Sequence, residues 1–506
     1  MPIATARSAT LLGVDGHAVD VEVHVSGGLP GFTIVGLPDT SCREARDRVR
    51  AAILSSNLAW PMQRVTVNLA PSTVRKGGAG LDLAMAVALL EASEQLPEHS
   101  IEGLGFVGEL GLDGTLRAVP GTLPLVAAVQ ASTVVVARAA AAEARLAGAE
   151  TVLPVARLQE VVEALRGEGG WPPAPPEPDP PPARPEPDLA DVRGHATARH
   201  VVEVAAAGGH HLLLSGPPGS GKTMLATRLP GILPDLDRAT SLESTRVHSV
   251  AGKLEPGVAG LLARPPLRAP HHGASAVAMV GGGGTWLAPG EISLAHGGVL
   301  FLDEMGEYPT AVLEALRQPL EEGSVRIVRA LHRVTLPARF LLVAATNPCP
   351  CGGSGAPGAC RCSPAAIARY NRRLSGPLLD RFDLRITVDR ATPAELLGAD
   401  RGEPSALVRE RVVAARERAR ARGVRVNADL DRRGLDEHAP LGDEASAALE
   451  AALQRGRLTG RGLQRVRAVA LTLADLADVP PPLTRAQVLT AMAYRTDTIV
   501  PDRLAG

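Results

Sequence analysis

The spacing of apolar and polar residues predicts both strands and helices in the first 170 residues. Valines recur at every second position from Val19 to Val25, so four of them share one face of a half-buried strand. Residues 65–69 give a second short strand, and the apolar run LDLAMAVALL at 81–90 predicts a buried helix. These elements indicate a mixed α and β fold for this part of the chain.

Beyond residue 187, short apolar strands alternate with helical segments. The strand candidates span 211–215, 299–302 and 340–345. Such alternation predicts an α/β fold with a parallel sheet. From about residue 391 to the end, the pattern becomes helical and rich in arginine.

One helix in this last part stands out for its charge. Residues 409–425 hold seven arginines, and the four small or apolar residues that precede or separate them share one helical face. Those four residues are Val408, Val412, Ala415 and Ala419. We expect the arginines to lie outside this face, solvated in a lid helix or, alternatively, in contact with DNA.

Composition divides the chain at residues 171–187, where 10 of 17 residues are proline. Such a stretch forms neither a helix nor a sheet ladder, so we expect a semi-rigid spacer. We predict an N-terminal domain over 1–170, the linker at 171–187, an α/β core over 188–390 and a helical domain over 391–506. The net charge is −1, but acidic side chains outnumber basic ones before the linker and the reverse holds after it.

Composition also excludes several classes of protein. No apolar run approaches the ~18 residues that span a bilayer, and the first residues lack the apolar segment of a secretory signal. Five cysteines in 506 residues do not make a disulfide framework. We therefore expect a cytoplasmic protein without a membrane partner. Aromatic residues make up 2%, too few for a base-stacking platform.

A phosphate-binding motif follows the strand at 211–215. The sequence GPPGSGKT has the spacing of a P-loop, and a helical segment begins directly after it. Glycines let backbone N–H groups turn toward phosphate oxygens, Lys222 supplies a charge to the β- and γ-phosphates, and Thr223 can ligate Mg²⁺. We expect ATP and Mg²⁺ at Gly216, Pro217, Pro218, Gly219, Ser220, Gly221, Lys222 and Thr223.

Two further strands end in polar residues that suit ATP hydrolysis. Asp303 follows the strand at 299–302 and would hold Mg²⁺, and Glu304 would act as the general base on the attacking water. Asn347 follows the strand at 340–345 and can orient the same water, although an asparagine there is also a common turn residue. Because parallel strands present their carboxyl ends at one edge, we expect these side chains near the P-loop.

Two arginines complete the hypothesis of an ATPase. Arg381, in the segment SGPLLDRFD, is a candidate arginine finger that reaches the γ-phosphate bound by a neighbouring subunit. Arg461, at the start of a C-terminal helix, can point inward. An isolated arginine is ordinarily a solvated surface group, so both assignments depend on the ATPase context.

Several long segments, in order along the chain, resemble one known family. They are AAAGGHHLLLSGPPGSGKTML, RAPHHGAS, PGEISLAHGGVLFLDE, AATNPCPCG and RYNRRLSGPLLDRFDL, with GLPGFTIVGLPDTSCREARDRVRAAI near the N-terminus. They resemble the AAA+ ATPases of the magnesium-chelatase-like group, specifically the ComM/YifB family. The resemblance implies a P-loop core with a helical lid, a hexameric ring that hydrolyses ATP, and DNA branch migration. It carries catalytic or binding roles to Lys222, Thr223, Asp303, Glu304, Asn347, Arg381 and Arg461.

The N-terminal part also resembles the Lon-protease-like domain, an α+β fold of the ribosomal S5 domain 2-like kind, through VRKGGAGLDL at 74–83. Lon proteases place a nucleophilic serine shortly after such an element. Here Gly80 stands near that place, and no lysine lies between Lys76 and Lys222 to act as its base. We expect a non-proteolytic scaffold for oligomerisation or DNA handling.

Two segments are candidates for substrate contact. The region between Thr223 and the strand at 299–302 resembles the family's pore-facing insert and contains residues 268–272, the glycines 281–284 and Trp286. A basic hairpin is predicted around 325–335, in the position of a pre-sensor hairpin. Its side chains Arg326, Arg329 and Arg333 could follow a phosphate backbone by charge, and a solvated hairpin edge explains them equally well.

Four of the five cysteines lie just after Asn347 with the spacing C-x-C-x₈-C-x-C. Cys349, Cys351, Cys360 and Cys362 could bind Zn²⁺ tetrahedrally and stiffen this loop. The spacing departs from the commoner C-x₂-C knuckle, and unmetallated thiols are the alternative. Disulfides are disfavoured in a reducing cytosol.

Together these features predict a homo-hexameric ring motor that couples ATP hydrolysis to movement along DNA, as a helicase or in branch migration. Two alternatives stay open. One is a magnesium-chelatase-like subunit that remodels a protein partner. The other is a scaffold that nucleotide binding switches without work on a substrate.

Overall fold

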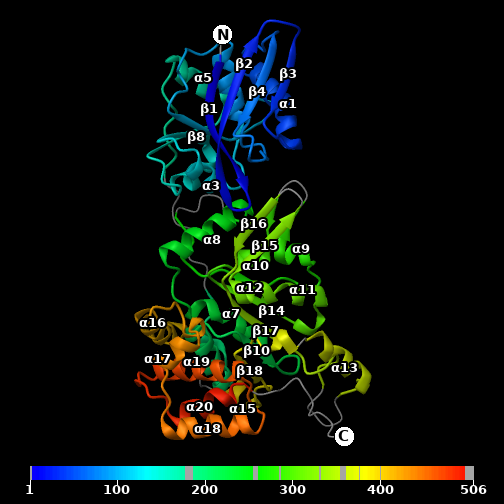
Figure 1. Cartoon of the computed structure of the whole chain (residues 1–506), viewed down its shortest axis with the longest axis vertical. Coiled ribbons are helices and arrows are strands. Elements are labelled where there is room, and N and C mark those ends of the chain that lie inside the picture. The colour runs from blue at the N-terminus through cyan, green and yellow to red at the C-terminus, as the bar shows by residue number, and fades with distance from the viewer. Residues whose placement is uncertain are drawn as a thin grey trace.

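The computed structural model describes residues 3–176, 186–254, 260–283, 287–329, 332–353, 360–374, 376–398 and 401–495. Figure 1 shows an elongated molecule with the N-terminal strands at one end, a second sheet in the middle and the C-terminal helices at the other end. Among the described helices, none combines the length and the apolar character that a membrane crossing requires.

The N-terminal block, residues 3–166, is built on a seven-stranded sheet with the order β3-β4-β2-β1-β5-β8-β9. Its valine alternation is confirmed, because Val19, Val21, Val23 and Val25 of β2 are all buried. Helix α2 buries nearly every residue, as its apolar run predicts. The strands of this sheet are β1 (Ile3–Leu12), β2 (Asp15–Ser26), β3 (Gly31–Val35), β4 (Arg64–Ala70), β5 (Leu104–Val107), β8 (Thr133–Ala137) and β9 (Thr151–Val155). The remaining elements are β6 (Glu109–Leu110), β7 (Leu116–Arg117), α1 (Thr40–Ser55), α2 (Asp82–Ala92), α3 (Thr122–Ala128), α4 (Ala141–Arg145) and α5 (Leu158–Arg166).

The core beyond the linker is a five-stranded parallel sheet with the order β11-β14-β17-β10-β18. The three strands expected from the sequence, β10, β14 and β17, lie side by side in it, so the prediction of a parallel α/β sheet is confirmed. Its strands are β10 (Leu212–Ser215), β11 (Leu267–Arg268), β14 (Val299–Leu302), β17 (Leu341–Thr346) and β18 (Leu384–Thr387). The helices between them are α6 (Ala196–Gly208), α7 (Lys222–Ile232), α8 (Arg238–Val250), α9 (Ala276–Val280), α10 (Glu291–Leu294), α11 (Thr310–Ala315), α12 (Arg317–Glu322), α13 (Pro364–Arg373) and α14 (Gly376–Leu379). Two short pairs accompany them, β12 (Gly281–Gly282) with β13 (Ala288–Pro289), and β15 (Ser324–Arg329) with β16 (His332–Pro337).

Different parts of the chain cover the two faces of the core sheet. Leu212 and Val343 point into a hydrophobic cluster that also contains residues of α6, α7 and the C-terminal helices. Leu213 and Leu342 point to the opposite side, into a cluster with α8, α10, the β15–β16 hairpin and Val14 of the N-terminal block. The strands are therefore buried on both faces, which explains why they are apolar without alternation.

The C-terminal helices, called the lid below, are α15 (Pro393–Leu397), α16 (Ser405–Ala421), α17 (Arg432–His438), α18 (Asp443–Gln454), α19 (Gly460–Leu476) and α20 (Arg485–Ala493). The apolar face expected for α16 is confirmed, since Val408, Val412, Ala415 and Ala419 are buried. The expectation that its arginines all lie outside is wrong for Arg416. Its guanidinium donates to the carbonyl oxygen of Ala206 at 2.9 and 2.7 Å, and burial lowers its pKa to about 10.

The turn between β1 and β2 is seated against the core. Gly13 has a φ of +67°, and a Cβ there would lie 2.2 Å from Cγ1 of Val334 in β16. Val14 packs into the cluster beneath the hairpin. The N–H of Gly121 donates to the carbonyl oxygen of Ser249 in α8 at 3.0 Å. The N-terminal block thus contacts the core directly, in addition to its covalent connection through the proline-rich linker.

Gly13→Ala should weaken this contact. The added methyl group meets Val334, a stiff β-branched side chain, and alanine at positive φ costs ~1 kcal/mol more than glycine. Gly103 is the matched control, because it has a φ of +76° and no atom within 4 Å of a Cβ. We expect the unfolding midpoint of the N-terminal block in Gly13→Ala to fall several degrees below that in Gly103→Ala, at roughly 2–4 °C per kcal/mol for a unit of about 150–250 residues. Equal midpoints in calorimetry would contradict the contact between the β1–β2 turn and the core.

Candidate nucleotide-binding site

Lys222 is the first residue of α7 and directly follows the loop at 216–221. Its ammonium donates to the carbonyl oxygens of Gly216 and Pro217 at 2.7 and 2.9 Å, and to Oδ1 of Asn347 at 3.3 Å. Burial lowers the pKa of Lys222, while the carboxylates of Asp303 and Glu304 oppose that shift. The end of β17 therefore lies within hydrogen-bond reach of the P-loop lysine, as the parallel arrangement predicts.

The next residue joins the loop to β14. The hydroxyl of Thr223 donates to Oδ2 of Asp303 at 2.7 Å, and Oδ1 of Asp303 accepts from the N–H of Glu304 at 2.9 Å. A hydroxyl and a carboxylate side by side are oxygen ligands of the kind that Mg²⁺ takes. The donor set that the structure brings together therefore fits this ion.

Glu304 is exposed and has a φ of +50°, in the left-handed region. This conformation costs a non-glycine residue of order 1–2 kcal/mol, and such strain clusters at functional sites. Nδ1 of His272 lies 3.2 Å from Oε2 of Glu304. The hydroxyl of Tyr308 donates to the carbonyl oxygen of Pro270 at 2.5 Å, which fixes the loop that carries His272.

Sequence reasoning assigned His272 to the pore-facing insert and missed its position beside Glu304. The contact joins segments that are distant in sequence, so no local pattern predicts it. The available signal was the motif RAPHHGAS itself, in which two adjacent histidines stand among small residues.

Arg381 and Arg461 lie near the amino-terminal ends of the core strands, whereas Lys222 lies near their carboxyl-terminal ends. Both line a cavity of about 810 Å³ together with His210 and His211, which precede β10. A strand of four residues spans ~13 Å, so the length of β10 separates this cavity from the P-loop. Within one chain, the structure does not bring these two arginines to Lys222.

The side chain of Arg381 is held by its own chain. Its guanidinium pairs with Glu321 of α12 and donates to the carbonyl oxygen of Pro377. Only 8% of the residue is exposed. Arg461 is exposed at the start of α19.

Comparison with known proteins places this architecture in a family. Profiles described as "Subunit ChlI of Mg-chelatase", "Magnesium chelatase, subunit ChlI" and "Magnesium chelatase, subunit ChlI C-terminal" match residues 21–140, 188–396 and 402–495. An uncharacterized protein of Mycobacterium tuberculosis is 45% identical over 502 residues, 98% of this chain and 99% of that protein. YifB of Escherichia coli is 43% identical over 501 residues, 98% of this chain and 97% of YifB. The competence protein ComM of Haemophilus influenzae is 43% identical over 484 residues, 94% of each chain.

The chain belongs to the ComM/YifB family of magnesium-chelatase-like AAA+ ATPases. The family expected from the sequence motifs is thereby confirmed. A shorter match, 29% identical over 178 residues, joins 35% of this chain to 22% of a probable DNA helicase MCM9 of Arabidopsis thaliana.

The β15–β16 hairpin of this ComM/YifB protein has two different faces. Val325, Ile327, Val334 and Leu336 are buried against the core. Arg326 and Arg333 are exposed on the other face, and Arg326 pairs with Glu322 at 3.0 Å. The predicted hairpin is thus confirmed as a structure. The side chain of Arg329 lies outside the described residues, as do Gly284 and Trp286 of the insert.

The four cysteines after Asn347 gather in space. Their sulfur atoms all lie within 4.8 Å of one another. Cys349 Sγ is 3.4 Å from Cys351 Sγ and 3.7 Å from Cys360 Sγ, and the last two are 3.8 Å apart. Tetrahedral Zn–S bonds of ~2.3 Å place sulfurs ~3.8 Å apart. Backbone N–H groups of Arg361 and Gly353 lower the pKa of Cys351 to about 6. The cluster therefore fits a metal ion such as Zn²⁺.

Lys76 of the N-terminal block is fully buried. Its ammonium donates to the carbonyl oxygen of Pro71, and burial lowers its pKa. Lys76 therefore makes a structural hydrogen bond inside the N-terminal block. The likeness of this block to Lon-type domains stays a prediction.

Proposed function

We propose that this protein is an ATP-hydrolysing ring motor that acts on DNA, as a helicase or in branch migration of the ComM type. The observation that supports the nucleotide site is the joint contact of Thr223 with Asp303 and of Lys222 with Asn347 at one edge of the sheet. ATP would lie over the loop at 216–221, with its β- and γ-phosphates near Lys222.

Thr223 and Asp303 would hold Mg²⁺ at this site. When bound, the ion would neutralise charge on the phosphate oxygens. The hydroxyl and carboxylate are already in contact at 2.7 Å, so little reorganisation of either side chain is needed to offer two oxygen ligands.

Glu304 would accept a proton from the attacking water, and Asn347 would orient that water. The backbone at Glu304 is left-handed, and its N–H donates to Oδ1 of Asp303. His272 lies at hydrogen-bond distance from the Glu304 carboxylate and would hold it in place between turnovers.

Arg381 and Arg461 would serve the nucleotide bound by an adjoining protomer. Both line the cavity at the amino-terminal edge of the strands, while the P-loop occupies the carboxyl-terminal edge. In a homo-hexameric ring that packs one edge on the other, the arginines of one protomer would face the phosphates of the next, and Arg381 would exchange its pairing with Glu321 for a phosphate. The geometry therefore favours a multi-subunit site over a complete site in one chain.

The exposed face of the β15–β16 hairpin would contact the phosphate backbone of DNA. Arg326 and Arg333 point away from the core, on a hairpin anchored by its buried apolar face. The names of two relatives, a competence protein and a probable DNA helicase, agree with a task on DNA.

A magnesium-chelatase-like subunit that remodels a protein partner is the second candidate, and the names of the matching family profiles favour it. DNA dependence of the ATPase separates the two candidates.

We further propose a division of the chain into domains and a linker, at 1–170, 171–187, 188–390 and 391–506. We also propose that the first domain is Lon-like and non-proteolytic, and that the protein is cytoplasmic.

Zinc is the metal that we propose for Cys349, Cys351, Cys360 and Cys362, because thiolate ligands with tetrahedral spacing are typical of structural zinc sites. The ion would hold the loop that begins two residues after Asn347. A Cβ on Gly352 would lie 2.4 Å from Cδ of Pro218, so this loop touches the P-loop.

The role of Glu304 can be tested by one conservative substitution. Glu304→Gln keeps the shape of the side chain but removes the basic oxygen, so ATP should still bind while turnover falls by 10²-fold or more, within the ~10²–10⁴-fold typical of general bases. Steady-state phosphate release and the affinity for a fluorescent ATP analogue measure the two quantities. Normal turnover in this variant would remove Glu304 from its role.

The contact of the hairpin with DNA can be tested with a double substitution. Arg326→Ala with Arg333→Ala should weaken DNA binding and DNA-stimulated ATPase activity, and should reduce the slope of log K against log salt by ~0.7–0.9 per lost phosphate contact. Arg418→Ala is the control, since that lid arginine is bound to Asp478. Forked, four-way and single-stranded DNA should be compared. An ATPase that is indifferent to every DNA structure would count against a motor on DNA.

Zinc binding by the four cysteines can be tested in the purified protein. Elemental analysis should find about one zinc per chain, as a four-thiolate site requires, and Cys351→Ser should lower that content. Cys42→Ala is the control, because Cys42 is buried in the N-terminal block, outside the cluster. Zinc-free protein that keeps its fold in chelator would contradict the site.

A further inference from the structure

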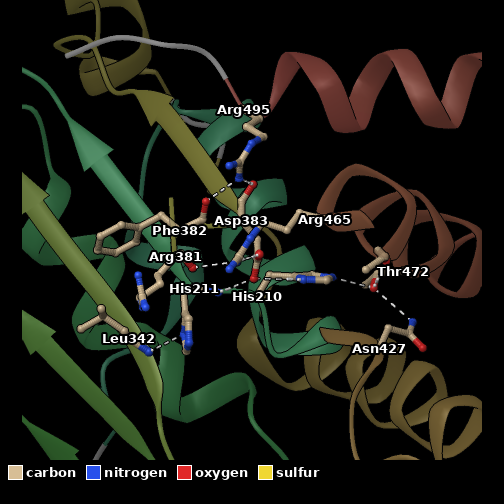
Figure 2. Close-up of polar contacts among 11 residues, drawn as sticks. His210, His211, Leu342, Arg381, Phe382, Asp383, Asn427, Arg465, Thr472 and Arg495 are labelled. Atoms are coloured by element: carbon tan, nitrogen blue, oxygen red, sulfur yellow. Dashed lines mark hydrogen bonds and ion pairs between the residues drawn. The ribbon is translucent and has the colours of Figure 1, made fainter. Parts of the chain in front are cut away.

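Two lid arginines hold the backbone that carries Arg381. Arg465 of α19 donates to the carbonyl oxygen of Arg381 at 2.9 Å, and Arg495, just after α20, donates to those of Phe382 and Asp383 at 2.5 and 3.3 Å. Figure 2 shows both side chains reaching from the lid to this segment, which connects α14 to β18. Three consecutive carbonyl groups are thus bound by guanidinium groups, in charge-assisted hydrogen bonds that are stronger than neutral ones.

Asp383 anchors Arg465 in this position. The Asp383 carboxylate pairs with the Arg465 guanidinium, accepts the N–H of His211 at 3.2 Å and lies 3.6 Å from Nδ1 of His210. Burial by itself would raise the pKa of Asp383, but the charge of Arg465 and the nearby His210 outweigh it and hold the pKa far below its usual range. The carboxylate is therefore charged at neutral pH and keeps Arg465 in one orientation.

The same lid is attached to the helix that begins at Lys222. Helix α16 packs against α7 and α19. A buried polar chain also joins α19 to the residue before β10, because Nε2 of His210 lies 2.8 Å from the hydroxyl of Thr472 in α19, which accepts from Asn427 at 3.1 Å (Figure 2). Packed helices therefore connect α7 to α19 through α16, and Arg465 connects α19 to the segment of Arg381.

We propose that Arg465 is a positioning residue that directs Arg381 toward the nucleotide of the adjoining protomer. This inference rests on the proposed function, in which Arg381 acts between protomers. Arg465 lines the same cavity as Arg381, but its guanidinium is bound to the Asp383 carboxylate and to the carbonyl group of Arg381, through which it acts. The state of the P-loop in one protomer thereby sets how the next protomer receives its arginine.

Four variants of the full-length protein test this inference. Arg381→Ala should lower kcat by ~10³-fold, as loss of an arginine finger does. Arg465→Gln should lower kcat by ~10²-fold through misplacement of Arg381, with KM for ATP unchanged within about twofold. The double variant should match Arg381→Ala alone, because a residue that acts through another adds nothing once the other is gone. Arg467→Gln is the matched control, since it lies on the same helix but pairs with Asp436 inside the lid, and it should keep kcat.

The outcomes separate this inference from the proposed function. Normal turnover in Arg381→Ala would overturn the role of Arg381 itself. Slow turnover in Arg381→Ala with normal turnover in Arg465→Gln would overturn only the positioning role. A double variant much slower than Arg381→Ala would also overturn it, because Arg465 would then act by another route. If Arg465→Gln does not assemble, Arg465→Lys keeps the charge beside Asp383 but lacks the planar fork that reaches two acceptors. A loss of kcat in Arg465→Lys at constant KM supports the inference, whereas a wild-type kcat in Arg465→Lys overturns it.

Discussion

Parallel pairing of the five core strands is the constraint on which the rest of the structure depends. Because the strands run in one direction, their carboxyl ends collect Lys222, Asp303 and Asn347 at one edge, and their amino ends collect Arg381 and the histidines before β10 at the other. Under the proposed function, one chain therefore carries two halves of a reaction site that face in opposite directions. The lid bridges these edges, since it packs on α7 and also binds the loop before β18.

Much of this arrangement could be predicted from local pattern. The P-loop, β10, β14 and β17 follow from short apolar runs that end in polar residues, and their parallel order places those residues together. The buried face of α16 and the β15–β16 hairpin follow equally from periodicity. The cysteine cluster is also local, because fourteen consecutive residues contain all four sulfurs. In each case the decisive interactions lie within one element or between strands whose order the fold class dictates.

The features that pattern did not predict depend on contacts between segments distant in sequence. Arg416 belongs to a run of arginines that looks like a solvated face, yet α6 offers it a carbonyl group, and that contact exists only in the folded lid. His272 also contacts Glu304, and Arg465 contacts Arg381, although each pair lies far apart along the chain. Charge and hydropathy along the chain describe each side chain alone, whereas these three contacts depend on which backbone or side-chain groups the tertiary structure places next to it.

The contact between the β1–β2 turn and the core joins the N-terminal block to the rest of the protein. Val14 is a member of the cluster that fills one face of the core sheet, beside Val334 and Leu336. A chain cut at the proline-rich spacer would leave these apolar side chains facing water, and exposed patches of this kind promote self-association. Although the spacer marks the boundary clearly in the sequence, the two blocks share part of one interior.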